Sequence, residues 1–156
     1  MPKVIPNEST MVRFCTTLTS MTAPAATEIN AGVDLTPYLI SITASASGNT
    51  VPTPTLDSLF EASIPGTNSA TFSSDYYRDD TTDTAWVTLP RRSKGYMVIQ
   101  RFQSNPTRTA VTGAKVEVWP IIVTSRAAGP MSSNTAQTFT VMCSVPVPPS
   151  EGAVVV

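Results

Sequence analysis

Apolar and polar residues alternate with a period of two along most of the chain, and groups of turn residues separate the alternating runs. In residues 11–18, for example, Val12 and Phe14 fall on one face and Arg13 on the other. This pattern is typical of half-buried β-strands joined by turns. The strands that it predicts are residues 11–18, 38–45, 56–64, 70–78, 95–102, 114–125 and 136–145. We therefore expect an all-β fold of about seven strands, a sandwich or a barrel, without parallel βαβ units.

Turn and proline residues within this pattern predict how some of the strands pair. Residues 65–69 (PGTNS) favour a tight reversal, so residues 56–64 and 70–78 are predicted to form a hairpin. Pro120 lies inside the sixth strand, where it removes a backbone donor, which predicts an edge strand or a bulge. Residues 44–55 form a long polar connection, a length more typical of functional arms than of tight turns.

The period changes after the fourth strand, where one short flanking α-helix is predicted at residues 81–89. Asp80 is placed to cap its first amides, and Pro90 prevents its continuation. A helix this short and rich in threonine does not persist alone, so it must dock on the sheets. Trp86 and Leu89 fall on one face and are the predicted docking residues.

Acidic residues precede this helix and basic residues follow it. Carboxylates at the amide-rich end and cations after the carbonyl-rich end each stabilise a helix by about 0.3–1 kcal/mol. This interpretation explains most of the pattern, and the alternative is a surface that binds a partner subunit. The candidate residues for contacts between subunits are Asp79, Asp80, Asp83, Arg91, Arg92 and Lys94.

Composition narrows the classes of function. Only 13% of the residues are charged, while Ser and Thr fill 41 of the 156 positions, so hydroxyl groups must form much of the surface. A net charge of −1 argues against stable binding of nucleic acid, which needs Lys and Arg to neutralise phosphates. The chain has no histidine, the usual general base and zinc ligand, and no Gly-rich phosphate loop. We expect neither an enzyme nor a bound cofactor or metal.

Cys15 and Cys143 lie in strand-like runs near opposite ends of the chain, and we expect two buried thiols, with a disulfide as the alternative. No apolar stretch approaches the roughly 20 residues that cross a bilayer, and the first ten residues lack the apolar run of a secretory signal. We therefore expect folding in a cytoplasm, without a membrane partner.

The last residues differ in composition from the rest of the chain. Residues 145–156 (VPVPPSEGAVVV) are rich in proline and end in apolar residues. Extended, they would reach on the order of 35 Å, enough to touch a neighbouring molecule. We expect one β-sandwich domain at 1–144 and an extended tail at 145–156, and simple disorder is the alternative for the tail.

Four stretches occur in an order and at a spacing that resemble the major tail tube protein of long-tailed bacteriophages. They are TEINAGVDLT (27–36), YYRDD (76–80), DTAWVTL (83–89) and SKGYMVIQRF (93–102), and the resemblance spans roughly residues 5–125. It implies a β-sandwich with one flanking helix, closing into a hexameric ring whose inner sheets join into one channel. It further implies rings that stack into a tube through which double-stranded DNA passes without stable binding.

The resemblance also implies a location and partners. The protein would belong to the virion, in the phage tail, after assembly in the host cytoplasm. Its partners would be copies of itself, the tape-measure protein, and the tail tip or baseplate and tail terminator proteins. In this family the channel is typically lined by acid. We assign that role to Asp57, Glu61 and Asp75, with outer solvent as the alternative.

Contacts between stacked rings are expected from residues 44–55 and from the C-terminal tail, with Arg91, Arg92 and Lys94 meeting acid on a neighbouring subunit. One alternative is a monomeric β-sandwich that serves as a binding or adhesin module. A nearer alternative is another virion component, such as a tail terminator or a head decoration protein. A binding module would display exposed aromatic residues, whereas Tyr76, Tyr96, Trp119 and Phe139 all fall in strands, where burial is expected.

Overall fold

A computed structural model describes residues 10–102 and 107–156, so the first nine residues of the predicted domain lie outside the described part of the chain. The strands are β1 (Met11–Cys15), β2 (Val33–Asp34), β3 (Leu39–Thr53), β4 (Ala62–Tyr77), β5 (Lys94–Gln100), β6 (Lys115–Ala128), β7 (Thr138–Ser144) and β8 (Ser150–Val154). The helices are α1 (Ala26–Ala31), the 3-10 turn η1 (Thr36–Tyr38) and α2 (Thr84–Thr88).

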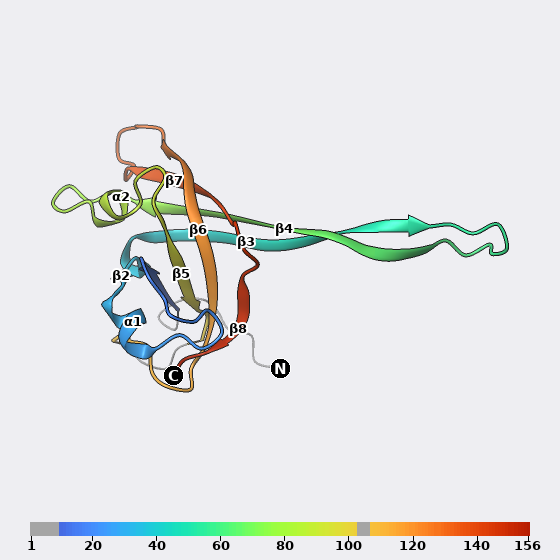
Figure 1. Cartoon of the computed structure of the whole chain (residues 1–156). Helices are drawn as coiled ribbons and strands as arrows, with labels where there is room; N and C mark the ends of the chain where they lie inside the picture. The colour runs from blue at the N-terminus through green and yellow to red at the C-terminus, as the bar shows by residue number, and fades with distance from the viewer. Residues whose placement is uncertain (1–9, 103–106) are drawn as a thin grey trace, which may run out of the picture.

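The strands form one antiparallel sheet in the order β2-β1-β5-β6-β7-β4-β3, with β8 also paired to β6. The sheet folds over, so that β1 and β5 lie across a shared interior from β7 and β4 (Figure 1). The predicted all-β fold class is therefore confirmed, with eight described strands and only short helices. None of the described helices is long and apolar enough to cross a membrane.

The core follows from the period-two alternation along each strand. One set of inward side chains fills the interior between the two halves of the sheet, with Trp119 tilted against Phe72 at 6.1 Å and Tyr76 stacked on Phe139 at 5.4 Å between ring centres. These four aromatic residues are at most 2% exposed, and Tyr96 is half-buried. Alternate residues of β1, β5 and β6 form a second cluster with Ile29 of α1 and with Ala153 and Val155 near the C-terminus.

The predicted arrangement of residues 38–78 is wrong, because β3 and β4 form one long hairpin. β3 pairs with β4 from Leu39↔Tyr76 to Thr53↔Ala62, so residues 44–55 are largely strand and the reversal lies at residues 54–61. The PGTNS segment lies within β4. Its Pro65 pairs with Thr50 beside a register shift, where the regular ladder is interrupted and the missing backbone N–H of proline is accommodated. In Figure 1 the hairpin projects far beyond the rest of the sheet.

Pro120 does not mark an edge strand, because β6 pairs with β5 on one side and with β7 and β8 on the other. Pairing to β8 ends at Val118 and pairing to β7 begins at Ile122, so Pro120 occupies the gap between two ladders. At this position the lack of an N–H group on proline removes no hydrogen bond to β7 or β8. Register shifts do occur nearby, next to Val116 and Val123.

The flanking helix is shorter than predicted. α2 begins at Thr84, and its N-cap residue is Asp83, which has a left-handed backbone (φ 45°) and makes no side-chain cap bond. Asp80 therefore does not cap the helix. Its carboxylate instead accepts a hydrogen bond from the Thr81 hydroxyl at 3.1 Å. The helix α1 was not predicted from its largely polar sequence. Its one buried residue, Ile29, packs in the second core cluster.

Residues 150–156 of the predicted tail are extended, but in this structure they pair with their own chain and do not project from it. β8 pairs with the first part of β6, and the backbone of Val156 exchanges hydrogen bonds of 3.0 Å with Pro24 and Ala26. The reason is that residues 152–156 alternate between exposed and buried positions, which leaves Ala153 and Val155 only 1% exposed each. The division of the chain into two units at residue 144 stays a prediction.

Cys15 and Cys143 are free and buried, which confirms the expectation of two separate thiols. Burial raises the pKa of the Cys15 thiol to about 11 and that of the Cys143 thiol to about 12. Both thiols are therefore protonated at neutral pH and poorly reactive.

Candidate assembly surfaces

The outer half of the β3–β4 hairpin, which we call the arm (residues 46–70), has no third strand beside it. β7 pairs with β4 only over Thr71–Tyr77, and within the described chain no strand pairs with the free side of β3. Apart from Gly66 and Ala70, every residue of the arm is exposed. Because an isolated two-stranded ribbon is only marginally stable in water, the exposed arm is a candidate surface for contact with a neighbour.

The tip of the arm carries apolar side chains. Leu56 and Leu59 are fully exposed, and Phe60 is 78% exposed. Behind them, Val51 and Ile64 form a cross-strand pair with about half of each side chain exposed (49% and 54%). Contiguous exposed apolar groups of this kind mark protein contacts. The sequence pattern predicts a half-buried strand at residues 56–64, although the spacing of Leu56, Leu59 and Phe60 departs from a period of two.

The three predicted lumen carboxylates are not brought together. Asp57 and Glu61 lie at the tip, whereas Asp75 lies near the base of β4, fourteen residue steps from Glu61, which is roughly 45 Å at about 3.3 Å per step. A hydrogen bond from Thr55 lowers the pKa of Asp57. The Asp75 carboxylate accepts hydrogen bonds from the Thr140 hydroxyl at 2.5 Å and the Ser41 hydroxyl at 2.8 Å, and these bonds lower its pKa.

Asp75 belongs to a sheet face formed mainly by hydroxyl side chains, which we call the hydroxyl face. It comprises the residues of β3, β4, β7 and β6 that point away from the core. Register pairs align Ser41, Asp75, Thr140 and Ala127 in one row and Thr43, Ser73, Met142 and Ser125 in the next. Hydroxyl contacts continue the face up the arm, between Ser45 and Thr71 and between Ser47 and Ser69, each at 3.1 Å.

A cluster of two arginines and an aromatic ring holds α2 against the sheet. The Trp86 ring lies edge-on to Phe139, with centres 5.1 Å apart, and the Arg78 and Arg126 guanidinium groups lie 4.0 and 3.8 Å from its centre. Arg126 also donates to the Trp86 carbonyl oxygen at 2.6 Å, and Arg78 pairs with Asp83. Leu89, the other predicted docking residue, is fully buried.

The other charged candidates around α2 have different environments. Asp79 is bound within its own loop, because its carboxylate accepts hydrogen bonds from the Thr81 amide and the Thr82 hydroxyl at 3.0 Å each, and these bonds lower its pKa. The side chains that remain available for a neighbour are exposed, and none of them forms an ion pair with another described residue. They are Asp80, Arg91, Arg92 and Lys94.

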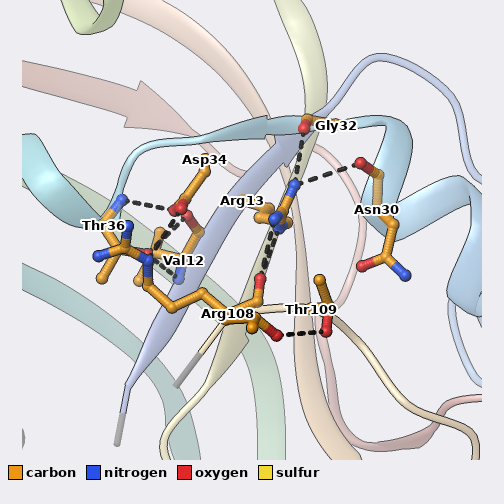
Figure 2. A network of polar contacts seen from close by, with 9 residues as sticks. Val12, Arg13, Asn30, Gly32, Asp34, Thr36, Arg108 and Thr109 are labelled. Carbon is orange, nitrogen blue, oxygen red and sulfur yellow. Dashed lines mark hydrogen bonds and ion pairs between the residues drawn. The ribbon is translucent and has the colours of Figure 1, made fainter. Parts of the chain in front are cut away.

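A second polar cluster, which the sequence did not reveal, fixes the opposite end of the sheet (Figure 2). Arg13 on β1 donates to the carbonyl oxygens of Asn30 (3.2 Å), Gly32 (3.1 Å) and Arg108 (2.8 Å from Nη2). Arg108 in turn pairs with Asp34 at 3.1 Å. The arginine therefore ties three chain segments together by their backbone. The described residues contain no group of His, Cys, Asp or Glu side chains suited to hold a metal ion.

Comparisons with known proteins agree with this architecture. The family model for phage tail tube proteins matches residues 1–156. No curated protein sequence matches the chain.

Solved structures match over nearly the whole chain. The tail of an empty GTA particle with C6 symmetry is 14% identical (TM-score 0.58), covering 94% of this chain and 96% of that one. The virion of a native gene transfer agent is 13% identical (TM-score 0.59; 96% and 100% covered). The sixfold-symmetrised baseplate of the anti-feeding prophage is 8% identical (TM-score 0.58; 94% and 95% covered). At these identities the likeness concerns the fold.

Proposed function

Because the chain belongs to the phage tail tube protein family, structural proteins of the virion tail, we propose that its copies close into hexameric rings that stack into a tube. Double-stranded DNA passes through this tube during ejection. The sixfold symmetry of the similar tail and baseplate structures supports the ring size. The role involves no catalysis and no cofactor.

The observation that carries the proposal is the arm with its apolar tip. A monomer gains nothing from a ribbon exposed on both faces that ends in Leu56, Leu59 and Phe60. A subunit of a ring or filament does, because head-to-tail association buries one surface of each copy against a different surface of the next. We propose that the arm makes the contacts between rings. The C-terminal residues 150–156 are paired to their own chain, but Val147 and Val156 remain about half exposed, so the tail stays a further candidate for such contacts.

Charged residues orient neighbouring subunits in these contacts. Asp57 and Glu61 at the tip give the arm a negative end, and Arg91, Arg92 and Lys94 give an exposed positive segment at the start of β5. We propose that these charges meet between neighbouring subunits, where the apolar tip excludes water around them. Asp80 and the loop around Asp79 and Asp83 remain further candidates for such contacts.

The partners follow from the same role. Within the tail the tube ends on tail tip or baseplate proteins and on a terminator protein, and before ejection the tape-measure protein fills the channel. A weakly acidic subunit suits passage of DNA, because a basic wall would bind phosphates by counterion release. Asp75 is the carboxylate that we propose for the channel.

Electron microscopy of the purified protein tests this proposal. The chain should form rings or tubes as its concentration rises, and a variant with Leu56→Ser, Leu59→Ser and Phe60→Ser should fold but not stack. Met131→Ser is the matched control, since Met131 is also 81% exposed but lies in another loop. A chain that stays monomeric at every concentration, with tail partners supplied, would favour the alternative of a monomeric binding module.

A further inference from the structure

The arm leaves the outer edges of both its strands without a neighbour. β3 pairs with β4 on one side only, and within the described chain β7 accompanies β4 only over Thr71–Tyr77. Residues 46–56 and 62–70 contain no charged residue, and the two charges of the arm, Asp57 and Glu61, lie at its tip. Uncharged strand edges rich in β-branched residues are templates for strands of other molecules. A free subunit in solution is therefore exposed to edge-to-edge association of its arm.

The pairing register shows which way the N–H positions of two arm prolines point. In an antiparallel pair, successive N–H groups of a strand point alternately to the partner and away from it. Pro65 pairs with Thr50, and two residues further along β3 Pro52 pairs with Ser63, so the two pairs are of the same kind. Because proline cannot donate, both pairs keep all their ladder bonds only where the N–H positions point away from the partner strand. Both prolines then remove donors from the free edges, one on each strand.

We infer that these prolines close both edges of the outer arm to strand addition, and so keep free subunits from associating through their arms before assembly. The outward N–H positions of residues 50–54 are 50, 52 and 54, of which Pro52 and Pro54 lack the group. Those of residues 62–65 are 63 and 65, of which Pro65 lacks it. Each edge therefore keeps a single outward N–H over these residues, at Thr50 and at Ser63, and one donor does not support a ladder.

A bulge beside the prolines acts in the same way. Between the pairs Gly48↔Asn68 and Thr50↔Pro65, β4 contains one residue more than β3, so the regular ladder is interrupted. A bulge bends and twists a strand, which further disfavours pairing with a straight edge of another molecule. The outer arm is thus left to contact neighbours through side chains, above all the apolar ones at its tip, and not by extending a sheet.

Substitution of the prolines tests this inference on free subunits, below the concentration at which the original chain assembles. One variant combines Pro52→Thr, Pro54→Thr and Pro65→Thr, which restores three N–H groups at exposed positions. Its urea midpoint should match that of the original protein, because none of these prolines packs in the core. On incubation it should form β-rich aggregates, with thioflavin T fluorescence higher by roughly tenfold or more. Pro148→Thr, exposed but outside the strands, is the control and should stay soluble.

A second variant separates edge pairing from misfolding. Thr50→Lys and Ser63→Lys, added to the three proline substitutions, place a charge at each remaining outward position and should restore solubility. A proline variant that stays as soluble as the original, or aggregation that the lysines do not reverse or that Pro148→Thr shares, would overturn the inference. Failure of the original chain to form tubes at high concentration would overturn the proposed function and leave this result unaffected.

Discussion

The arm and the body, by which we mean the rest of the described chain, both consist mainly of strands, yet only the body has a core to pack in. In the body, Trp119 and Phe139 are 1% exposed and fill the interior of the folded sheet. In the arm, the cross-strand pair of Val51 and Ile64 remains about half exposed. The difference is one of burial: the apolar residues of the body fill its own core, whereas those of the arm have no cover within the described chain.

This comparison predicts that stability resides in the body and assembly in the arm. The largest effect on stability is expected for Trp119→Ala, which removes a fully buried ring that contacts Phe72. It should lower the free energy of unfolding by about 3–5 kcal/mol in urea titrations followed by circular dichroism. Trp119→Phe, which keeps an aromatic ring in the core, should lose clearly less. An equal loss for both would mean that packing at this position is not the source of stability.

A smaller loss is expected for Arg126→Ala, at the margin of the body. This change removes the hydrogen bond to the Trp86 carbonyl oxygen and one of the two guanidinium groups that flank the ring. The free energy of unfolding should fall by about 1–2 kcal/mol, and Trp86 fluorescence should shift as α2 loosens. The exposed Arg91→Ala serves as control and should change neither. If both variants behave alike, the arginine contacts do not hold α2.

Asp75 should give a smaller, pH-dependent effect at the base of the arm. Hydrogen bonds from Thr140 and Ser41 lower its pKa in the folded state, so its contribution to stability is present above the unfolded pKa. It is lost as the pH falls through the lower, folded value. Asp75→Asn should therefore be less stable than the original protein at pH 7, with the gap narrowing below about pH 4. A gap that is constant with pH would contradict this assignment.

The smallest effect on stability is expected at the tip. Leu56→Ser, Leu59→Ser and Phe60→Ser change side chains that are already in solvent, so together they should alter the free energy of unfolding by less than about 0.5 kcal/mol. The same urea titration measures it. A large loss would show that the tip packs on its own chain and is not available to a neighbour.

The sequence predicted the body well because its alternation, turns and buried aromatic residues all favour one fold. It failed in the arm for an identifiable reason. Residues 65–69 have the composition of a tight turn, and Pro65 should interrupt a strand. In the structure Pro65 sits at a register shift on a strand that has no neighbour on its other side, where a missing donor costs little.

The candidate sites were predictable only in part. Local chemistry identified Trp86 and Leu89 as anchors of a short helix, because an amphipathic segment must dock. The position of Asp75 relative to Asp57 and Glu61 depends on where the hairpin turns, which alternation does not determine. The Arg13 cluster left no sequence signal, since its partners are backbone carbonyl groups from segments as far away as Arg108.

Hydrogen–deuterium exchange, measured on dilute subunits and on assembled tubes, tests the division between body and arm most directly. Amides of the core strands β5 and β6 should be protected in both states. Amides of residues 46–70 should exchange rapidly in the free subunit and become strongly protected in tubes, because only a neighbour can cover them. Protection of the arm in the free subunit, or no gain of protection on assembly, would contradict the claim that the arm is built for contact with other copies.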